Sequence, residues 1–196
     1  MIRSRFLFYT AVIFSFMIAL MSYRFLVLDL DFAFSEMSGH ILDRKWVFIA
    51  HISASPLALA LGAINMWERR NRKHPVVHRW TGRGYATAIL VGGVSGLGLA
   101  VGAEGGIVAT FGFGILSVLW VAVTAQAVRL AMARDFKGHR RWMIRSFALT
   151  FAAVTLRLYL PGFIIFGEMT YAQASVWVAW LCWVPNLALA EWWLRR

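Results

Sequence analysis

Four side chains of this sequence stand out as suited to binding or chemistry: His51, His78, His139 and Arg157. A neutral imidazole can ligate haem iron or pass protons near neutral pH. A guanidinium presents five N–H donors to carbonyl, carboxylate or phosphate oxygens. Arg157 stands in a largely apolar run without acidic residues, "GHRRWMIRSFALTFAAVTLRLYLP" over 138–161. The pattern therefore indicates a site for a cofactor or another small molecule.

His78 and His139 are the better matched pair of candidate haem ligands. Two axial imidazoles reach one iron from opposite faces, so they must lie at similar depth on different helices. Each of these histidines comes just before a long apolar segment. Each also has a basic neighbour, which leaves the alternative that the imidazole binds a lipid phosphate or a loop carbonyl. No HExxH, CxxC or intramembrane carboxylate cluster indicates another metal site.

His51 lies about five residues into a second apolar segment, with Ser55 one helical turn further on. Pro56 has no N–H group and leaves the carbonyl of Ile52 without its helical donor. A polar, kinked helix face inside a membrane lines a cavity or meets a neighbouring helix. Both a structural histidine and a ligand-binding or proton-handling histidine fit this pattern.

Arg157 ends a small, polar helix face that also contains Ser146, Thr150 and Ala153. It is about nine residues, or roughly 13 Å, from the outer end of its segment. A charge at this depth costs at least a few kcal/mol, so its donors need acceptors. Backbone carbonyls, hydroxyl groups, neutral His51, water, or an oxygen of a bound molecule can serve.

The elements that must position these residues are membrane-spanning helices. The chain of 196 residues is 60% hydrophobic and only 15% charged, which is typical of an integral membrane protein. A spanning helix needs about 20 apolar residues. We predict an all-α protein with a single transmembrane domain over 1–196, whose six spans cover about 6–28, 46–66, 84–103, 107–132, 142–166 and 171–194.

The basic residues predict the orientation of these spans. With the amino terminus in the cytoplasm, 15 of the 20 Lys and Arg residues fall in cytoplasmic segments, and only Arg44 and Lys45 fall outside. The net charge of +11 then reflects topology, and anionic lipids can neutralise it. A nucleic-acid partner is not expected, because there is no soluble basic domain. Asp29, Asp31, Glu36, Asp43, Glu104 and Glu168 fall on the outer side.

Small residues in the third span, "GGVSGLGLAVGAEGG" from Gly92 onward, predict close helix packing. The alternative is a flat cofactor lying against Gly92 and Gly96. Gly105 and Gly106 are expected to form a tight outer turn. We predict a four-helix bundle core of spans two to five, with spans one and six on its periphery. Cys182 is the single cysteine, so no intramolecular disulfide can form.

Two motifs, "HRWTGRGY" over 78–85 and the run over 138–161, carry a family resemblance. Over about 45–165 the sequence resembles the bacterial membrane family called domain of unknown function 2306. That resemblance implies a multi-pass protein of the bacterial inner (cytoplasmic) membrane and brings no activity. The "HRW" followed by glycine is also weakly similar to cytochrome b561-like membrane proteins, which implies b-type haem in a helix bundle.

These observations give three functional hypotheses. The first is a small-molecule-binding redox component that holds b-type haem or a quinone, with His78 and His139 as ligands and Arg157 facing a carbonyl or anionic group. The second is a structural or assembly subunit of a larger membrane complex, with Trp177, Trp180 and Trp183 contacting lipid or partner proteins. The third is a small transporter that uses a cavity between His51 and Arg157. No particular catalytic residue is predicted.

The distribution of basic residues makes the topology testable. Reporter fusions at both ends and in each connection should show six spans with both termini in the cytoplasm, because positively charged connections stay there. An amino terminus in the periplasm, or an odd number of spans, would contradict this topology.

Overall fold

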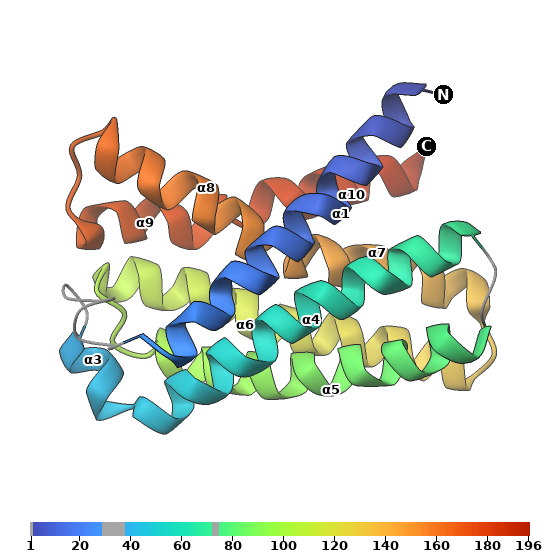
Figure 1. Cartoon of the computed structure of the whole chain (residues 1–196), viewed down its shortest axis with the longest axis horizontal. Helices are drawn as coiled ribbons and strands as arrows, with labels where there is room; N and C mark the ends of the chain where they lie inside the picture. Colours follow the sequence, from blue (N-terminus) through green and yellow to red (C-terminus); the bar gives the residue numbers. More distant parts are fainter. Residues whose placement is uncertain (1, 29–37, 72–74) are drawn as a thin grey trace.

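The computed structural model describes residues 2–28, 38–71 and 75–196, and these ranges contain helices and no strand (Figure 1). The side chains of 2–7, 38, 40 and 68–71 lie outside the described set, as do the predicted outer acids Asp29, Asp31 and Glu36. The elements are α1 (Ile2–Ser22), the short 3-10 helix η1 (Tyr23–Leu26), α3 (Ser38–Asp43), α4 (Lys45–Asn71), α5 (Pro75–Ala100), α6 (Gly106–Met132), α7 (Phe136–Thr150), α8 (Ala152–Ile165), α9 (Tyr171–Leu181) and α10 (Val184–Arg195).

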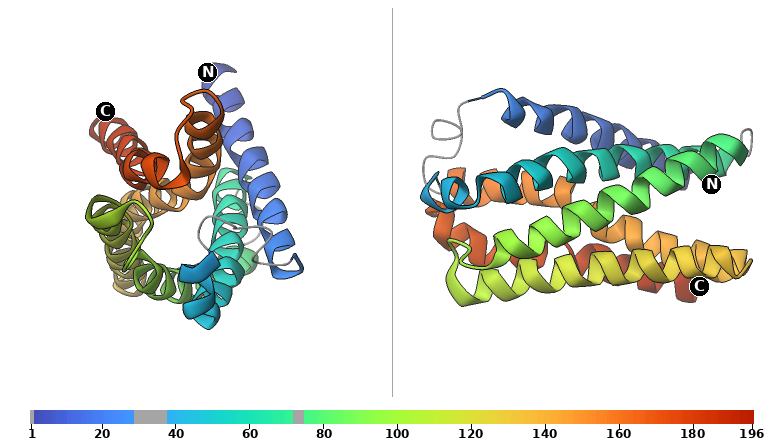
Figure 2. Two further views of the ribbon diagram at one scale, coloured as in Figure 1. Left: turned by 90° about the vertical axis from the view of Figure 1, so that its left-hand side faces the viewer. Right: turned by 90° about the horizontal axis from the view of Figure 1, so that it is seen from below.

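Five segments are long and apolar enough to cross a membrane: Phe8–Leu26, Lys45–Trp67, Gly106–Met132, Phe136–Ile165 and Tyr171–Arg195. They confirm the predicted all-α integral membrane fold. The remaining predicted span corresponds to α5, which has 26 residues and runs alongside α4 and α6 (Figure 2). Its basic first turns and its glycine-rich second half make α5 less apolar than the other five segments.

Two helices begin earlier than predicted, and both carry a candidate histidine. α5 starts at Pro75, whose fixed φ and missing N–H suit the first position of a helix. α7 starts at Phe136, because the Asp135 side chain accepts a 2.9 Å hydrogen bond from the Gly138 N–H and caps the first turn. His78 and His139 are therefore each the fourth residue of a helix, rather than loop residues preceding one.

The fifth predicted span is broken at Phe151, between α7 and α8. Next to the break, the Thr150 hydroxyl donates to the Ser146 carbonyl one turn earlier in α7. Such bonds compete with the helical N–H donors and bend helices. α8 consequently leaves the line of α7 (Figure 1).

The sixth predicted span is broken at Cys182 and Trp183, between α9 and α10. Pro185 cannot donate a helical hydrogen bond, which removes one bond from this turn. The Cys182 carbonyl instead accepts from the Thr155 hydroxyl and, at 2.8 Å, from the Asn186 amide. The break therefore joins the last span to α8.

The predicted four-helix core is present, because α4 packs on α5, α5 on α6, α6 on α7, and α7 back on α4. α1 lies along α4 on the outside of this ring (Figure 2). The sequence predicted that the last span is peripheral, but the structure places it in the core. Its Val178, Cys182 and Trp183 belong to the same buried cluster as Tyr85 and Leu149. α9 therefore completes the core beside α6 and α8.

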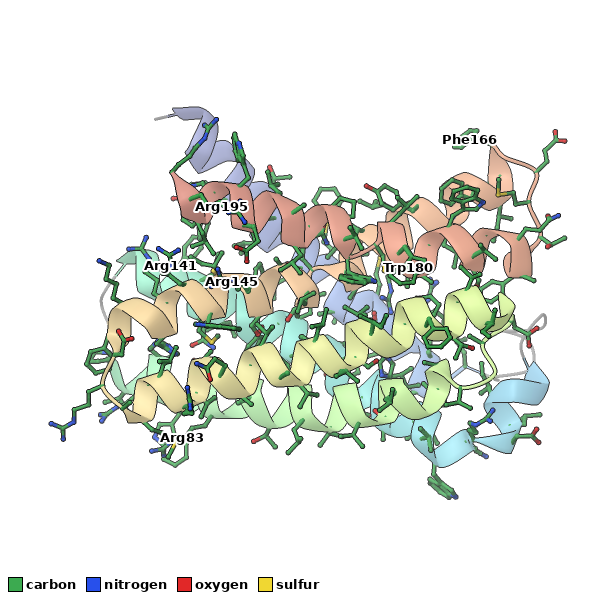
Figure 3. All side chains as sticks on the ribbon, turned by 180° about the vertical axis from the view of Figure 1, so that it is seen from behind. Arg83, Arg141, Arg145, Phe166, Trp180 and Arg195 are labelled. Atoms are coloured by element: carbon green, nitrogen blue, oxygen red, sulfur yellow. The ribbon has the colours of Figure 1, made fainter. Side chains whose placement is uncertain are left out.

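Both termini lie at one end of the bundle, together with the connection between α6 and α7 (Figure 1). Arg83, Arg141, Arg145 and Arg195 lie toward this end, whereas Phe166 lies at the opposite end (Figure 3). The opposite end also holds the turn between α5 and α6. There Gly102 and Gly106 have φ of 78° and 66°, whereas Gly105, the other predicted turn glycine, is the N-cap of α6 with φ of −79°.

Close approach of α6 and α9 depends on Gly112. A Cβ at this position would lie 2.8 Å from the Ala179 Cβ and 2.9 Å from the Ala179 carbonyl oxygen. Backbone atoms cannot move aside as a flexible side chain can, so the two helices would have to separate. Gly162 in α8 provides a contrast, because a Cβ there meets no heavy atom within 4 Å.

Gly112→Ala should therefore lower stability by about 1–3 kcal/mol through overpacking. Gly162→Ala should be neutral or stabilising by up to about 1 kcal/mol, since alanine favours helix. Thermal unfolding of both variants in the same detergent measures the difference. Equal midpoints for the two variants would refute the close contact between α6 and α9.

Candidate functional site

A cavity of about 370 Å³ lies within the bundle, and it contains His51 and Arg157. The walls come from α4, α5, α6, α8 and α9, with η1 and the end of α7 completing them. The predicted cavity among spans two to five is therefore present, with additional walls from the first and last spans. Most of its surface is apolar, and its polar lining residues are Ser22, His51, Ser55, Glu104, Ser117, Thr150, Arg157, Tyr171 and Ser175.

His51 is held by the backbone of α5. Its Nδ1 lies 2.8 Å from the Gly92 carbonyl oxygen. Because a carbonyl only accepts, Nδ1 must carry the proton in this bond, and Nε2 of the neutral ring is then an acceptor. The Ser55 hydroxyl lies 3.4 Å from each ring nitrogen, too far for a strong hydrogen bond. His51 thus has a fixed orientation and keeps one nitrogen for another partner.

The glycines of α5 allow this arrangement. A Cβ at Gly96 would lie 3.0 Å from Cε1 of His51, and a Cβ at Gly92 would lie 2.8 Å from the Ser55 hydroxyl oxygen. The ring of Trp120 also packs beside Gly92. The glycine stripe therefore provides close packing, and Gly96 also lines the cavity.

Arg157 lines the cavity, and among the described residues its guanidinium has one hydrogen-bond partner. Its Nη1 donates to the Ala153 carbonyl oxygen at 3.0 Å, one of the partners predicted from the sequence. Among the described residues, no carboxylate contacts the guanidinium. The charge is close enough to His51 to interact with it electrostatically. The cavity thus combines a cationic hydrogen-bond donor with a histidine inside apolar walls.

A buried hydroxyl network forms the floor of the cavity. The Tyr85 hydroxyl lies 2.8 Å from the hydroxyl oxygens of both Ser146 and Thr150. The Trp120 indole N–H donates to Thr150 at 2.8 Å, and Thr124 lies 2.7 Å from Ser146. The network ties α5, α6 and α7 together. Within it, Trp120 and Thr150 also line the cavity.

Sequence reasoning placed Ser146 and Thr150 on a polar face but missed Tyr85, Trp120 and Thr124. The sequence did contain one indication of these residues, because each is a hydroxyl or indole side chain inside an apolar segment. Inside a bilayer such groups must find partners within the protein. Their pairing across segments is what the sequence did not reveal.

His78 and His139 do not line this cavity. They lie near the end of the bundle that holds the termini, in the first turns of α5 and α7. The His139 Nδ1 lies 2.8 Å from the Ala127 carbonyl oxygen and must donate to it, which leaves Nε2 as the other ring nitrogen. The structure therefore divides the four predicted residues into two sites.

The two histidines nevertheless lie at matching levels. Tyr85 and Ser146 bond to each other across α5 and α7, and they are 61 residues apart in the sequence. His78 and His139 have the same separation and lie two turns before Tyr85 and Ser146 on helices that run in the same direction (Figure 1). The two histidines therefore lie at similar levels along the bundle.

Comparison with known proteins places the chain in a family. The profile described as "Predicted membrane protein (DUF2306)" matches residues 48–194. The chain belongs to this family. The match extends beyond the 45–165 recognised in the sequence and includes the last span, whose residues complete the core. No curated protein and no solved structure matches the chain.

The family description fixes the membrane location but assigns no activity. All four candidate residues lie within the matched region, whereas α1 lies outside it. Any function for this DUF2306 protein must therefore be argued from its cavity and its two groups of histidine and arginine side chains.

Proposed function

We propose that this DUF2306 protein binds a small, mainly apolar molecule in its central cavity through a carbonyl or carboxylate oxygen, and that a quinone is the class that fits best. The observation that carries the proposal is Arg157, a guanidinium among apolar walls whose partner, in the part of the chain that the structure describes, is a single backbone carbonyl. A cation in such surroundings is costly unless its donors are satisfied. A ligand oxygen would satisfy them.

The shape and chemistry of the lining favour a quinone over a fully polar solute. A quinone is a flat apolar ring with carbonyl oxygens at opposite edges, and it would supply two-electron redox chemistry when bound. Arg157 would donate to one oxygen. His51 keeps its proton on Nδ1 toward Gly92, so its neutral Nε2 can accept a hydrogen bond from a hydroxyl of the reduced form, the quinol. Leu156, Leu160 and Phe113 would cover the apolar part.

A ligand site also distinguishes this proposal from the two other hypotheses. A purely structural subunit has no need for a cavity that contains a largely unpaired guanidinium. A transporter would use the same residues but would need a path from the cavity to both membrane faces. The cavity walls include Glu104 and Tyr171 from the end opposite the termini, whereas the hydroxyl network closes the other side.

For the location we propose the bacterial inner membrane, with both termini in the cytoplasm. Support comes from the end of the bundle that holds the termini, where Arg79, Lys137, Arg140, Arg141 and Arg195 gather. Positively charged connections are retained on the cytoplasmic side. In this orientation the cavity lies toward the outer leaflet.

A b-type haem between His78 and His139 is a second candidate, supported by their matched level on α5 and α7. The His139 Nδ1–H bond to the Ala127 carbonyl is of the kind that orients a ligating imidazole and leaves Nε2 for the iron. Haem would supply one-electron chemistry at the termini end, and a quinone in the cavity would be a suitable redox partner.

Arg157→Lys and Arg157→Leu test the cavity proposal. Lysine keeps the charge but loses the planar set of five donors, so both variants should bind a short-chain ubiquinone at least about tenfold more weakly, a loss of about 1.4 kcal/mol. Native mass spectrometry of copurified species and quinone-dependent thermal shifts measure the loss. Arg129→Leu, which removes an exposed arginine of α6, is the matched control and should bind normally.

The same variants separate ligand binding from a purely structural role. If backbone carbonyls are the only partners, Arg157→Leu should be as stable as the wild type or more stable, since apolar volume replaces a buried charge. Identical bound species in wild-type, Lys and Leu proteins would end the proposal. A partner protein that copurifies in stoichiometric amount, with an empty cavity, would favour the structural subunit.

Absorbance of the purified protein tests the haem candidate. If haem is bound, His78→Ala and His139→Ala should each abolish the Soret band while the protein still inserts, because each removes one axial ligand. His51→Ala should keep the band, and so should His74→Ala at a position outside the described residues. A wild-type protein without visible absorbance, expressed with adequate haem, would exclude this ligand pair.

A further inference from the structure

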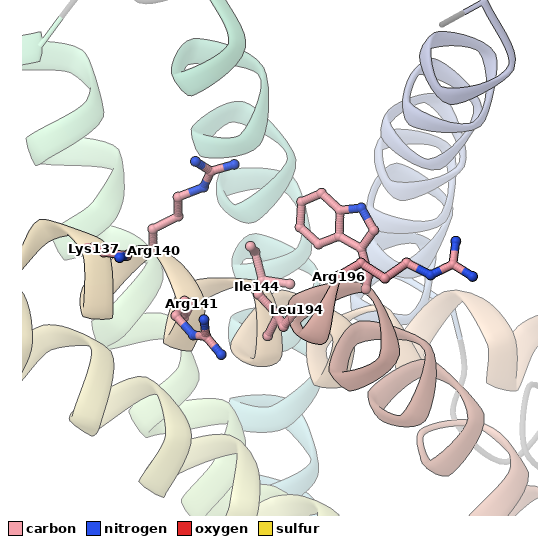
Figure 4. Close-up of a pocket in the computed structure, with 7 residues that line it drawn as sticks. Lys137, Arg140, Arg141, Ile144, Leu194 and Arg196 are labelled. Carbon is pink, nitrogen blue, oxygen red and sulfur yellow. The ribbon is translucent and has the colours of Figure 1, made fainter.

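A second hollow, separate from the cavity, lies where α7 begins and α10 ends. This basic groove has a volume of about 470 Å³ (Figure 4). It is formed by two segments that span the membrane, Phe136–Ile165 and Tyr171–Arg195, at the ends where they leave it. The groove is lined by Lys137, Arg140, Arg141, Ile144, Trp193, Leu194 and Arg196.

Cations stand on both walls of the groove. Lys137, Arg140 and Arg141 come from the first turns of α7, with Arg140 and Arg141 extending to different sides. Arg196 comes from the opposite wall, and its side chain extends away from α7 (Figure 4). The Arg196 guanidinium is held in place by stacking on the Trp192 ring, with 3.6 Å between its central carbon and the ring centroid. None of these lining residues has an acidic side chain.

Two acidic side chains among the described residues lie near the groove, and each has a partner. Asp135 caps α7 by accepting from the Gly138 N–H. Glu191 accepts two hydrogen bonds from Arg145, a bidentate pair that joins α10 to α7. Glu191 also lies close enough to Arg141 to interact with it electrostatically, so it offsets part of the charge of the groove. The groove keeps a positive charge that a ligand from outside must balance.

The remaining lining residues suit a lipid better than a free anion. Ile144 and Leu194 give the groove an apolar surface between its cationic walls. Trp193 is 52% exposed at the same level, and exposed tryptophan is typical of the headgroup region of a bilayer. Phosphate groups of lipids lie at this depth, whereas a free phosphate would gain nothing from the apolar surface.

We propose that the basic groove is a binding site for the headgroup of an anionic phospholipid. The cations of the two walls attract the negatively charged headgroup, and the start of the acyl chains covers Ile144 and Leu194. A lipid bound in this way bridges α7 and α10, next to the Arg145–Glu191 pair that already joins them. The site is independent of any quinone or haem.

The test compares two double variants that remove the same charge at the same end of the bundle. Arg140→Gln with Arg196→Gln changes one cation on each wall. Arg79→Gln with Arg83→Gln is the control, because these two arginines of α5 do not line the groove. Native mass spectrometry in detergent, with dioleoyl phosphatidylglycerol or dioleoyl phosphatidylcholine added, reports the bound lipid.

Wild type and control should bind phosphatidylglycerol alike, and the groove variant should bind it about 30-fold more weakly, as expected for two cations of about 1 kcal/mol each near a membrane surface. Phosphatidylcholine should bind weakly to all three. Equal losses in the two variants would show a general charge effect and overturn the site. So would equal binding of the two lipids, or displacement of phosphatidylglycerol by inorganic phosphate at millimolar concentration. Equal melting temperatures without lipid show that the variants are folded.

Discussion

A polar group inside a bilayer has no water to bond to, and this constraint accounts for most of the specific contacts in the bundle. Tyr85, Ser146 and Thr150 satisfy one another across α5 and α7, and His51 donates to a carbonyl of α5. Each bond also fixes the position of one helix against another, because apolar contacts alone give little direction in lipid. Arg157 is the exception. Within the described residues its guanidinium bonds to the Ala153 carbonyl alone, and it lines the cavity. For this reason we propose a ligand there.

Close backbone approach is the second requirement, since these bonds span short distances between helices. The His51 bond reaches the Gly92 carbonyl only because Gly96 leaves room for the ring. Gly62 does the same where Phe147 and Tyr85 pack against α4. A methyl group at either glycine would push apart the helices that carry the polar partners. Packing and hydrogen bonding are therefore coupled at the same positions.

The sequence predicted the isolated polar residues well, because His51 and Arg157 contrast with the apolar runs around them. It predicted pairings poorly. Tyr85 ends a basic motif that is typical of a membrane interface, so nothing local indicated that its hydroxyl reaches α7. The sequence did not predict that α5 starts at Pro75, because the basic residues that follow Pro75 are typical of a loop. The two broken regions are linked by a bond from the Thr155 hydroxyl to the Cys182 carbonyl, 27 residues away, which no local pattern encodes.

The break at Phe151 also explains why the cavity and Arg157 occur together. α7 packs on α6, whereas α8 packs on α9 and touches α1, so the two halves of one span follow different neighbours. Their divergence leaves space beside the small residues Gly96, Ala152 and Ala153, all of which line the cavity. An unbroken helix would have continued along α6 and filled that space. The threonine hydroxyl that bends the span thus opens the cavity, and the same bend brings the guanidinium of α8 into it.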